Sequence, residues 1–90
     1  MILVNSKAKL KELSEYRAFF VDATGIALEQ GLGSSAQPLV NTALLGALAK
    51  ISGDLSLDNL LKAVEKLVPQ KTKRNIQAAG RAYESVDGFE

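Results

Sequence analysis

The sequence predicts an α/β fold: part of a three-layer α/β/α domain in which two short N-terminal strands, expected to be parallel, precede a helix-rich C-terminal half. Two short apolar runs, 2–4 and 17–22, are typical of strands in a sheet. Helical spacing of apolar residues fills the second half of the chain. Between them the stretch 38–50 is apolar on nearly every side. A helix of that kind must be covered on several faces by other elements.

The first apolar run, Ile2-Leu3-Val4, predicts a buried strand that ends near Asn5-Ser6. The second, 17–22, is apolar on both faces, as in a sheet covered on both sides. The connection from Ser6 to Tyr16 is close to the minimum of about a dozen residues for a parallel crossover, which favours a parallel pair. Within it, Leu10 and Leu13 lie among charged residues and predict a short amphipathic helix over 7–16.

A two-turn helix is expected over 23–30, with Thr24 as the candidate N-cap. The Gly- and Ser-rich stretch 31–36 predicts a loop. The apolar helix should then run from about Leu39 to Ile51, with Pro38 at or before its first turn and Gly53 ending it.

Two further helices complete the predicted order. Ser56 is expected to cap the first, and Pro69 to end it. Its apolar stripe comprises Leu57, Leu60, Leu61, Val64 and Leu67. The last helix is expected over about 71–86, and residues 87–90 are expected to fray. Gly46 and Gly80 lie inside helices, where Gly costs roughly 1 kcal/mol relative to Ala, so a close neighbour is expected at each.

Two strands do not make an independently stable, doubly covered sheet. Phe19, Phe20 and Val21 of the second strand need neighbours that ninety residues do not supply. The chain is therefore expected to be a single, incomplete domain over residues 1–90.

Composition excludes several classes of function. Eleven basic and ten acidic residues leave a net charge of +1, and there is no Trp, so neither nucleic acid nor a membrane surface is an expected partner. The chain has no Cys and no His. A disulfide framework, a thiolate zinc site and a cysteine-ligated cluster are thereby excluded within it, and no metal site and no catalytic residue is predicted. No apolar run approaches a membrane span of about 18 residues and no signal peptide is evident, which predicts a cytoplasmic setting.

Four polar residues are weak candidates for cofactor binding. Asp22 and Thr24 follow the second strand, at the edge where open α/β sheets bind ligands. The alternative is a simple strand-to-helix turn capped by Thr24. Asn41 and Thr42 interrupt the apolar stretch and could face a partner subunit or a coenzyme A group, or bond to nearby backbone at the helix start.

Two other features point more strongly to structure than to function. The loop Gly31-Leu32-Gly33-Ser34-Ser35 lacks the glycine pattern and following Lys of a phosphate loop. The final helix carries a basic cluster that could attract a coenzyme A phosphate, although a solvated helix face is the simpler interpretation. This cluster comprises Lys71, Lys73, Arg74 and Arg81.

Two segments together, Val21–Ala27 and Pro38–Ala47, resemble the C-terminal half of the gamma subunit of 2-oxoacid:ferredoxin oxidoreductases, the pyruvate and 2-ketoisovalerate enzymes. The most specific part is the spacing Asn41-Thr42-x-x-Leu45-Gly46-Ala47. Ser56–Leu60 and the tail segments Val68-Pro69, Lys73–Ala78 and Tyr83-Glu84 extend the resemblance over nearly the whole chain. Family gamma domains are about twice as long and have a Gly-rich turn in an N-terminal half that is absent here.

The resemblance implies an assembly that converts a 2-oxoacid and coenzyme A to acyl-CoA and CO2, using thiamine diphosphate, iron–sulfur clusters and ferredoxin. It implies alpha, beta and delta-type subunits as partners and, for the gamma domain, a structural role linked to coenzyme A handling. A homo-oligomer is a further alternative. No cofactor is expected on this chain alone.

Two other functions remain open from the residues. One is a small self-sufficient helical interaction domain without catalytic activity. The other is an independent enzyme, which is disfavoured because the chain lacks His, Cys and any paired nucleophile and base.

Overall fold

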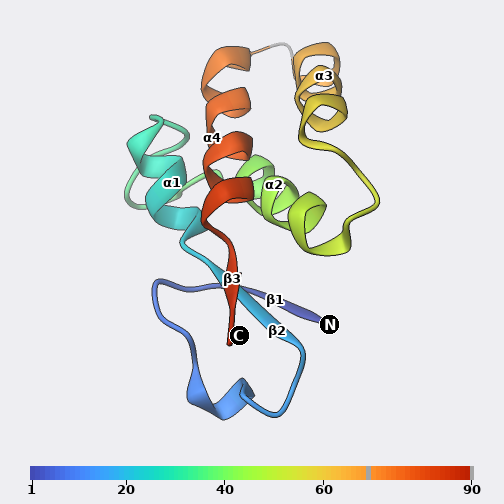
Figure 1. The fold of residues 1–90 in the computed structure, drawn as a ribbon. Coiled ribbons are helices and arrows are strands. Elements are labelled where there is room, and N and C mark those ends of the chain that lie inside the picture. Colours follow the sequence, from blue (N-terminus) through green and yellow to red (C-terminus); the bar gives the residue numbers. More distant parts are fainter. Residues whose placement is uncertain (69, 90) are drawn as a thin grey trace.

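A computed structural model describes residues 1–68 and 70–89, except for the Leu67 side chain. Three short strands form one sheet, and four helices gather at one end of it (Figure 1). The strands are β1 (Ile2–Asn5), β2 (Ala18–Val21) and β3 (Asp87–Gly88). The helices are α1 (Ala23–Glu29), α2 (Asn41–Ser52), α3 (Leu57–Leu67) and α4 (Thr72–Ser85). The predicted α/β class with a helix-rich C-terminal half is confirmed.

The sheet has the order β1-β2-β3, with β2 in the centre. β1 and β2 are parallel, with Ile2 opposite Ala18 and Asn5 opposite Val21, as predicted. The expectation that β1 is buried is wrong, because it pairs on one side only, and Ile2 is 37% exposed.

The expectation that residues 87–90 fray is also wrong for the described part. β3 pairs antiparallel with β2, and the Phe89 ring meets the edge of the Phe20 ring at 5.4 Å. Burial of apolar surface at Phe20 and backbone pairing at Asp87 and Gly88 hold this segment, and composition alone did not indicate either. Glu90 lies outside the described residues.

The helix predicted over 7–16 is reduced to a 3-10 turn at Lys11–Leu13. Leu10 has an extended backbone and is 37% exposed. A helix this short needs tertiary packing to offset the cost of nucleation. Its two leucines do not find a sufficient apolar surface, so only a single turn forms.

Helix α2 begins at Asn41, two residues later than predicted, and Pro38 lies before its first turn, as predicted. Pro38 forms an isolated bridge with Gly33, and the Leu39 N–H donates to the Leu32 carbonyl at 3.1 Å. These contacts close the 31–39 segment into a loop. Gly53 ends α2 in the left-handed region, at φ 73°, as predicted.

Helix α3 matches its prediction at the N-terminus, where the Ser56 hydroxyl accepts from the Asn59 N–H at 3.2 Å. Leu60 and Val64 of the predicted stripe are buried against α2 and α4. The side chain of Leu67 and the predicted stop at Pro69 lie outside the described residues.

Helices α2 and α4 form the most extensive contact between any two elements. Small side chains on both make this contact: Ala43, Gly46, Ala47, Ala78, Ala79 and Ala82 are all buried. The predicted close neighbour of Gly46 is confirmed, since a Cβ there would collide with the Ala79 carbonyl oxygen. The same prediction for Gly80 is wrong, because a Cβ there would meet nothing within 4 Å.

These two glycines predict opposite effects of one substitution. Gly46→Ala should lower the free energy of unfolding by about 1–3 kcal/mol, because the new methyl group forces α2 away from the α4 backbone. Gly80→Ala should raise it by up to about 1 kcal/mol through helix propensity alone. Urea denaturation of both variants measures the difference, and equal effects at the two sites would contradict the packing described here.

Candidate functional site

A cavity of about 430 Å³ opens at the carboxyl ends of β1 and β2, between α1 and the end of α4. This strand-end cavity occupies the position where ligands bind in open α/β sheets. Its lining combines three basic and three acidic residues with apolar and small ones. The residues are Lys7, Lys9, Phe20, Val21, Asp22, Gly25, Ile26, Glu29, Arg81, Ser85 and Asp87.

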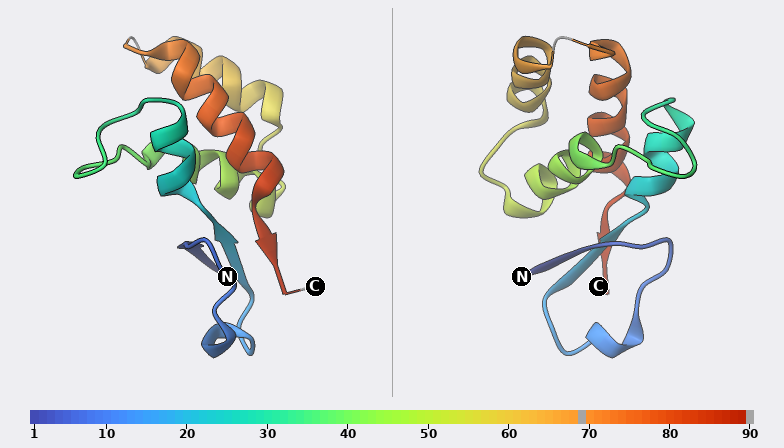
Figure 2. Two further views of the ribbon diagram at one scale, coloured as in Figure 1. Left: turned by 90° about the vertical axis from the view of Figure 1, so that its left-hand side faces the viewer. Right: turned by 180° about the vertical axis from the view of Figure 1, so that it is seen from behind.

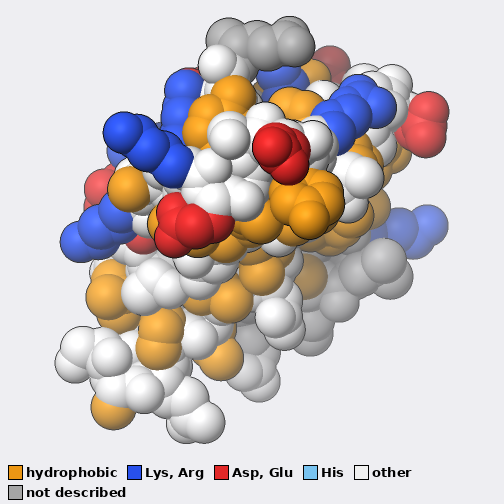
Figure 3. Space-filling model, turned by 90° about the horizontal axis from the view of Figure 1, so that it is seen from below, with side chains coloured by type: hydrophobic (Ala, Val, Ile, Leu, Met, Phe, Trp, Pro, Cys, Tyr) orange, Lys and Arg blue, Asp and Glu red, His pale blue; other side chains and the backbone are white. Residues whose placement is uncertain are grey.

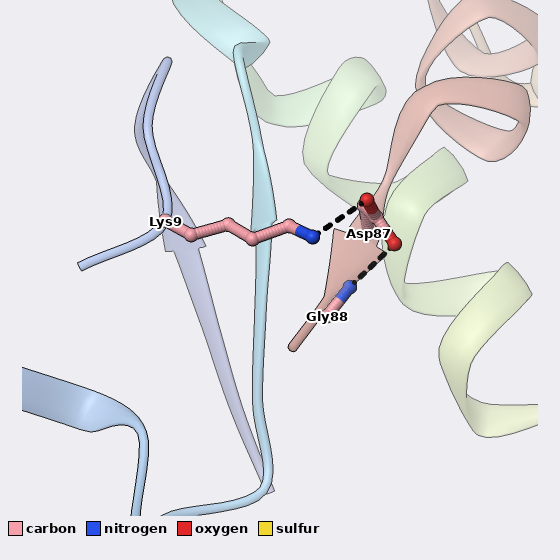
Figure 4. A network of polar contacts seen from close by, with 3 residues as sticks. All are labelled: Lys9, Asp87 and Gly88. Atoms are coloured by element: carbon pink, nitrogen blue, oxygen red, sulfur yellow. Dashed lines mark hydrogen bonds and ion pairs between the residues drawn. The ribbon is translucent and has the colours of Figure 1, made fainter. Parts of the chain in front are cut away.

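The charges of the cavity are largely paired with one another. Lys9 Nζ lies 3.0 Å from Asp87 Oδ2, which joins the β1–β2 connection to β3 (Figure 4). The Gly88 N–H donates to Asp87 Oδ1 at 2.9 Å. On the other side Arg81 of α4 lies 2.9 Å from Glu29 of α1. All four paired side chains are more than one-third exposed, so solvent and salt screen both ion pairs.

Asp22 lines the strand-end cavity and is also the N-cap of α1, in place of the predicted Thr24. Its Oδ1 accepts from the Gly25 N–H at 2.9 Å. β2 ends at Val21 and the helix begins at Ala23, so Asp22 is the residue with non-helical dihedral angles and its carboxylate reaches the free N–H groups. One Asp22 oxygen is thereby engaged by the backbone.

Thr24 joins α1 to β1. Its hydroxyl accepts from Asn5 Nδ2 at 2.8 Å, and its N–H donates to Asn5 Oδ1 at 3.2 Å. The Asn5 side chain therefore fixes the carboxyl end of β1 against the start of α1. This is a structural role that the spacing of the sequence did not reveal.

Asn41 and Thr42 lie at the start of α2 and do not line the strand-end cavity. Asn41 is exposed. The Thr42 hydroxyl donates to Asn75 Oδ1 at 2.6 Å, and Asn75 Nδ2 donates to the Lys71 carbonyl at 3.0 Å. Thr42 therefore links α2 to the start of α4. The four candidate residues fall at two separate places.

The sequence alone does not indicate most of the charged residues in the cavity. Lys9 and Asp87 lie at opposite ends of the chain, and the sequence predicts a frayed tail at Asp87. Arg81 was placed on a basic cluster, but it pairs with Glu29, while Lys71 Nζ donates to the Gly31 carbonyl at 3.4 Å. The rule that ligands bind at the carboxyl ends of strands indicated the place but not these residues.

The types of side chain that are present limit which metal ions this site could hold. Among the described residues no group of three or more His, Cys, Asp and Glu side chains could hold a metal ion. No helix in the described part of the chain is long and apolar enough to cross a membrane. Two of the three basic and two of the three acidic residues that line the cavity are paired with each other.

Comparison with known proteins places the chain in one family. Residues 1–85 match the family model described as pyruvate ferredoxin/flavodoxin oxidoreductase. The "Pyruvate synthase subunit PorC" of Methanothermobacter thermautotrophicus is 38% identical over 87 residues, covering 96% of this chain and 46% of that protein. The "Pyruvate/ketoisovalerate oxidoreductases common subunit gamma" of Pyrococcus furiosus is 34% identical over 98 residues, covering 100% and 50%.

A crystal structure of the pyruvate oxidoreductase subunit PORC from Thermotoga maritima superposes with a TM-score of 0.79 at 32% identity. The match covers 99% of this chain and 52% of that one. The chain thus spans about half the length of the curated relatives it matches.

Asp22 and Asn41 provide a matched test of structural roles. Asp22→Ala should cost about 1 kcal/mol of stability because it removes the cap of α1, whereas Asp22→Ser should restore most of the loss. Asn41→Ala should change stability by less than about 0.5 kcal/mol, since this side chain is exposed. Thermal unfolding of the three variants measures these changes in stability. If Asp22→Ala were as stable as the original chain, the cap would be dispensable.

The Lys9 ammonium and the Gly88 N–H lower the pKa of Asp87 below its ordinary value. A carboxyl whose pKa is lowered on folding favours the folded state above its unfolded pKa. That contribution is lost as the pH falls through the lowered pKa of the folded state. Carboxyl NMR titration should report a lowered pKa for Asp87 that moves upward in Lys9→Gln. An unchanged pKa in that variant would mean that the pair does not persist in solution.

Proposed function

Because this chain belongs to the pyruvate ferredoxin/flavodoxin oxidoreductase family, we propose that it forms part of the gamma subunit of a 2-oxoacid:acceptor oxidoreductase and serves there as a structural and assembly module. The match over residues 1–85 carries this proposal. The whole enzyme would convert a 2-oxoacid and coenzyme A to acyl-CoA and CO2. Residues 1–90 would then constitute one incomplete gamma-type domain in a cytoplasmic complex.

An assembly role agrees with the surface of the chain. Leu39, Leu45 and Leu48 remain 55%, 44% and 43% exposed, although they belong to the most apolar stretch. Leu45 and Leu48 lie about one turn apart on α2, and exposed apolar patches are typical of surfaces that other proteins cover. The expected partners are the alpha, beta and delta-type subunits, with ferredoxin reached through the complex.

The residues of this chain do not fit the iron–sulfur clusters of such an enzyme. Clusters are held by Cys thiolates, and the sequence contains no Cys. The described residues likewise offer no acidic group arranged to hold the metal ion of a thiamine diphosphate. We therefore assign these cofactors to other subunits and no reaction step to this chain.

Any contribution to coenzyme A handling would be indirect. In the strand-end cavity Lys9 and Arg81 are already paired with Asp87 and Glu29. An acyl-CoA phosphate would have to compete with these carboxylates. The supported role is therefore to position neighbouring subunits rather than to bind the coenzyme.

The alternative, a self-sufficient helical interaction domain, agrees less well with the structure. The mixed sheet contributes Val21 and Leu3 to the main core, so strands and helices form one unit.

Purification from the native source tests the proposal. A tagged form of the chain should co-purify with larger subunits that carry thiamine diphosphate and iron–sulfur clusters, and the complex should reduce ferredoxin in the presence of a 2-oxoacid and coenzyme A. Recovery of the chain without any such subunit would refute the proposal. A tagged unrelated cytoplasmic protein from the same cells serves as the control for non-specific capture.

A further inference from the structure

The dipeptide Asp87-Gly88 in β3 has a sequence that favours rearrangement of the backbone. When Gly follows Asp, the Gly amide nitrogen can attack the aspartate side chain, because Gly has no Cβ to obstruct the approach and its backbone turns freely. The other aspartates precede larger residues: Asp22 precedes Ala, Asp54 precedes Leu and Asp58 precedes Asn. Asp87 is therefore the aspartate of this chain most open to the reaction.

The geometry of β3 places the reacting groups together. The Gly88 N–H donates to Asp87 Oδ1 at 2.9 Å, so this nitrogen lies beside the carboxyl group with which it would close a five-membered ring (Figure 4). Reactions within a chain gain most from proximity when the reacting atoms are about 3–3.5 Å apart. The Asp87 side chain is 63% exposed, so water reaches it. The nucleophile, the carboxyl group and the water that the reaction consumes thus meet at one site.

Two contacts restrain the same dipeptide in the folded chain. β3 pairs with β2, with Phe20 opposite Asp87, and this pairing fixes the backbone. Lys9 Nζ lies 3.0 Å from Asp87 Oδ2 and favours the ionised carboxylate. The neutral acid is the reactive form, because its oxygen leaves as water. The paired strand and the ion pair therefore both slow the attack.

These restraints are weak, since β3 is short and lies at the end of the chain. It comprises two residues, and in both views of Figure 2 it extends away from the helices to the C-terminus. Phe89 packs its ring against Phe20 but is itself 38% exposed. Seen from below, acidic and basic side chains lie together at the surface, where water and salt screen their pairing (Figure 3). Short terminal segments of this kind open at a low free energy.

We propose that Asp87-Gly88 is a site of spontaneous isoaspartate formation, restrained while β3 is docked on β2 and released when β3 opens. The dipeptide lies beyond residues 1–85, the part of the chain that matches the family model. The inference therefore does not depend on the proposed gamma-subunit role.

The rearrangement consumes only water and needs no oxidant or cofactor. The Gly88 nitrogen forms a bond to Asp87 Cγ and gives up its proton, and the Cγ–O bond breaks, so that one water molecule leaves and a succinimide ring remains. Water then adds to the former main-chain carbonyl of Asp87, and the bond from that carbon to the Gly88 nitrogen breaks. The chain now continues through Cβ and Cγ of Asp87, and the former main-chain carbonyl becomes a free carboxylate. The mass of the chain is unchanged.

Isomerisation lengthens the backbone of β3 by one methylene group. Asp87 and Gly88 then cannot both keep their places opposite β2, and the Phe89 ring is moved away from Phe20. Lys9 loses the side-chain carboxylate that it contacts, because Cγ is now part of a main-chain amide. The docked strand thereby becomes an open tail, and the strand-end cavity loses Asp87 from its lining.

Incubation of the full ninety-residue chain at neutral pH tests the inference. Peptide mapping with electron-transfer fragmentation distinguishes isoaspartate from aspartate at each position, and labelling by a protein L-isoaspartate methyltransferase measures the amount of product. Isoaspartate should accumulate at Asp87 and not at the other aspartates, Asp22, Asp54 and Asp58. Asp87→Glu should abolish the product, because a glutamate would have to close a larger ring that forms more slowly.

Matched variants separate the docking of β3 from the effect of sequence alone. Phe89→Ala removes the ring packed on Phe20 and should raise the rate at Asp87 at least about threefold, because β3 is then open for more of the time. Lys9→Gln should raise it at least about twofold, since more of the carboxyl group is then neutral. Leu45→Ala truncates a side chain of similar exposure, 44%, on α2 and should leave the rate unchanged. Unaltered hydrogen exchange of the α4 amides would show that each variant still folds.

Leu55→Gly provides an internal reference, because it places a second Asp-Gly pair, at Asp54, in the exposed bend between α2 and α3. Asp87 should react more slowly than Asp54 in the folded variant and at a similar rate in urea. The inference is overturned if Asp54 reacts in this variant while Asp87 stays unchanged even in Phe89→Ala. It is also overturned if Asp87 reacts as fast as Asp54 in the folded variant, or if Phe89→Ala and Leu45→Ala have the same effect, since docking would then not control the rate.

Discussion

The close approach of α2 and α4 at Gly46 is the constraint on which the rest of this structure depends. The α4 backbone at Ala79 occupies the space that a side chain on Gly46 would need. Alanines on both helices allow the two axes to come together, and α1 and α3 then pack on either side of the pair. Small residues at this contact also leave the larger leucines of α2 for its outer face. The close contact at Gly46 therefore determines which side chains form the core and which leucines of α2 remain exposed.

The direction of α4 places the strand-end cavity. Because α4 crosses α2 and leads directly into β3, it brings Arg81 beside Glu29 and Asp87 beside Lys9. The cavity is thus bounded by the start of α1, the β1–β2 connection and the end of α4. Its charges come from distant parts of the sequence and neutralise each other. The cleft at the usual ligand position of an α/β sheet is thus bordered by two ion pairs that join separate elements of the fold.

The sequence predicted the features that depend on local pattern. The strands at Ile2–Asn5 and Ala18–Val21, the cap at Ser56 and the stop at Gly53 each follow from residues next to one another. Features that depend on distant contacts were missed. The strand at Asp87 forms because β2 has a free edge and the Phe20 ring packs against Phe89, and the helix predicted over 7–16 is reduced to one turn at Lys11–Leu13. Of the candidate residues, Asp22 reaches the cavity, whereas Thr42 joins two helices.

The antiparallel pairing of β3 with β2 has a consequence for how the chain folds as it is made. Phe19 pairs with Gly88, and the whole helical region lies between them in the sequence. During synthesis from the N-terminus, one edge of β2 and one side of Phe20 stay open until every helix has emerged from the ribosome. Transiently open edges of this kind expose a nascent chain to association and to chaperone binding. Completion of the sheet therefore waits for the synthesis of α4 and β3.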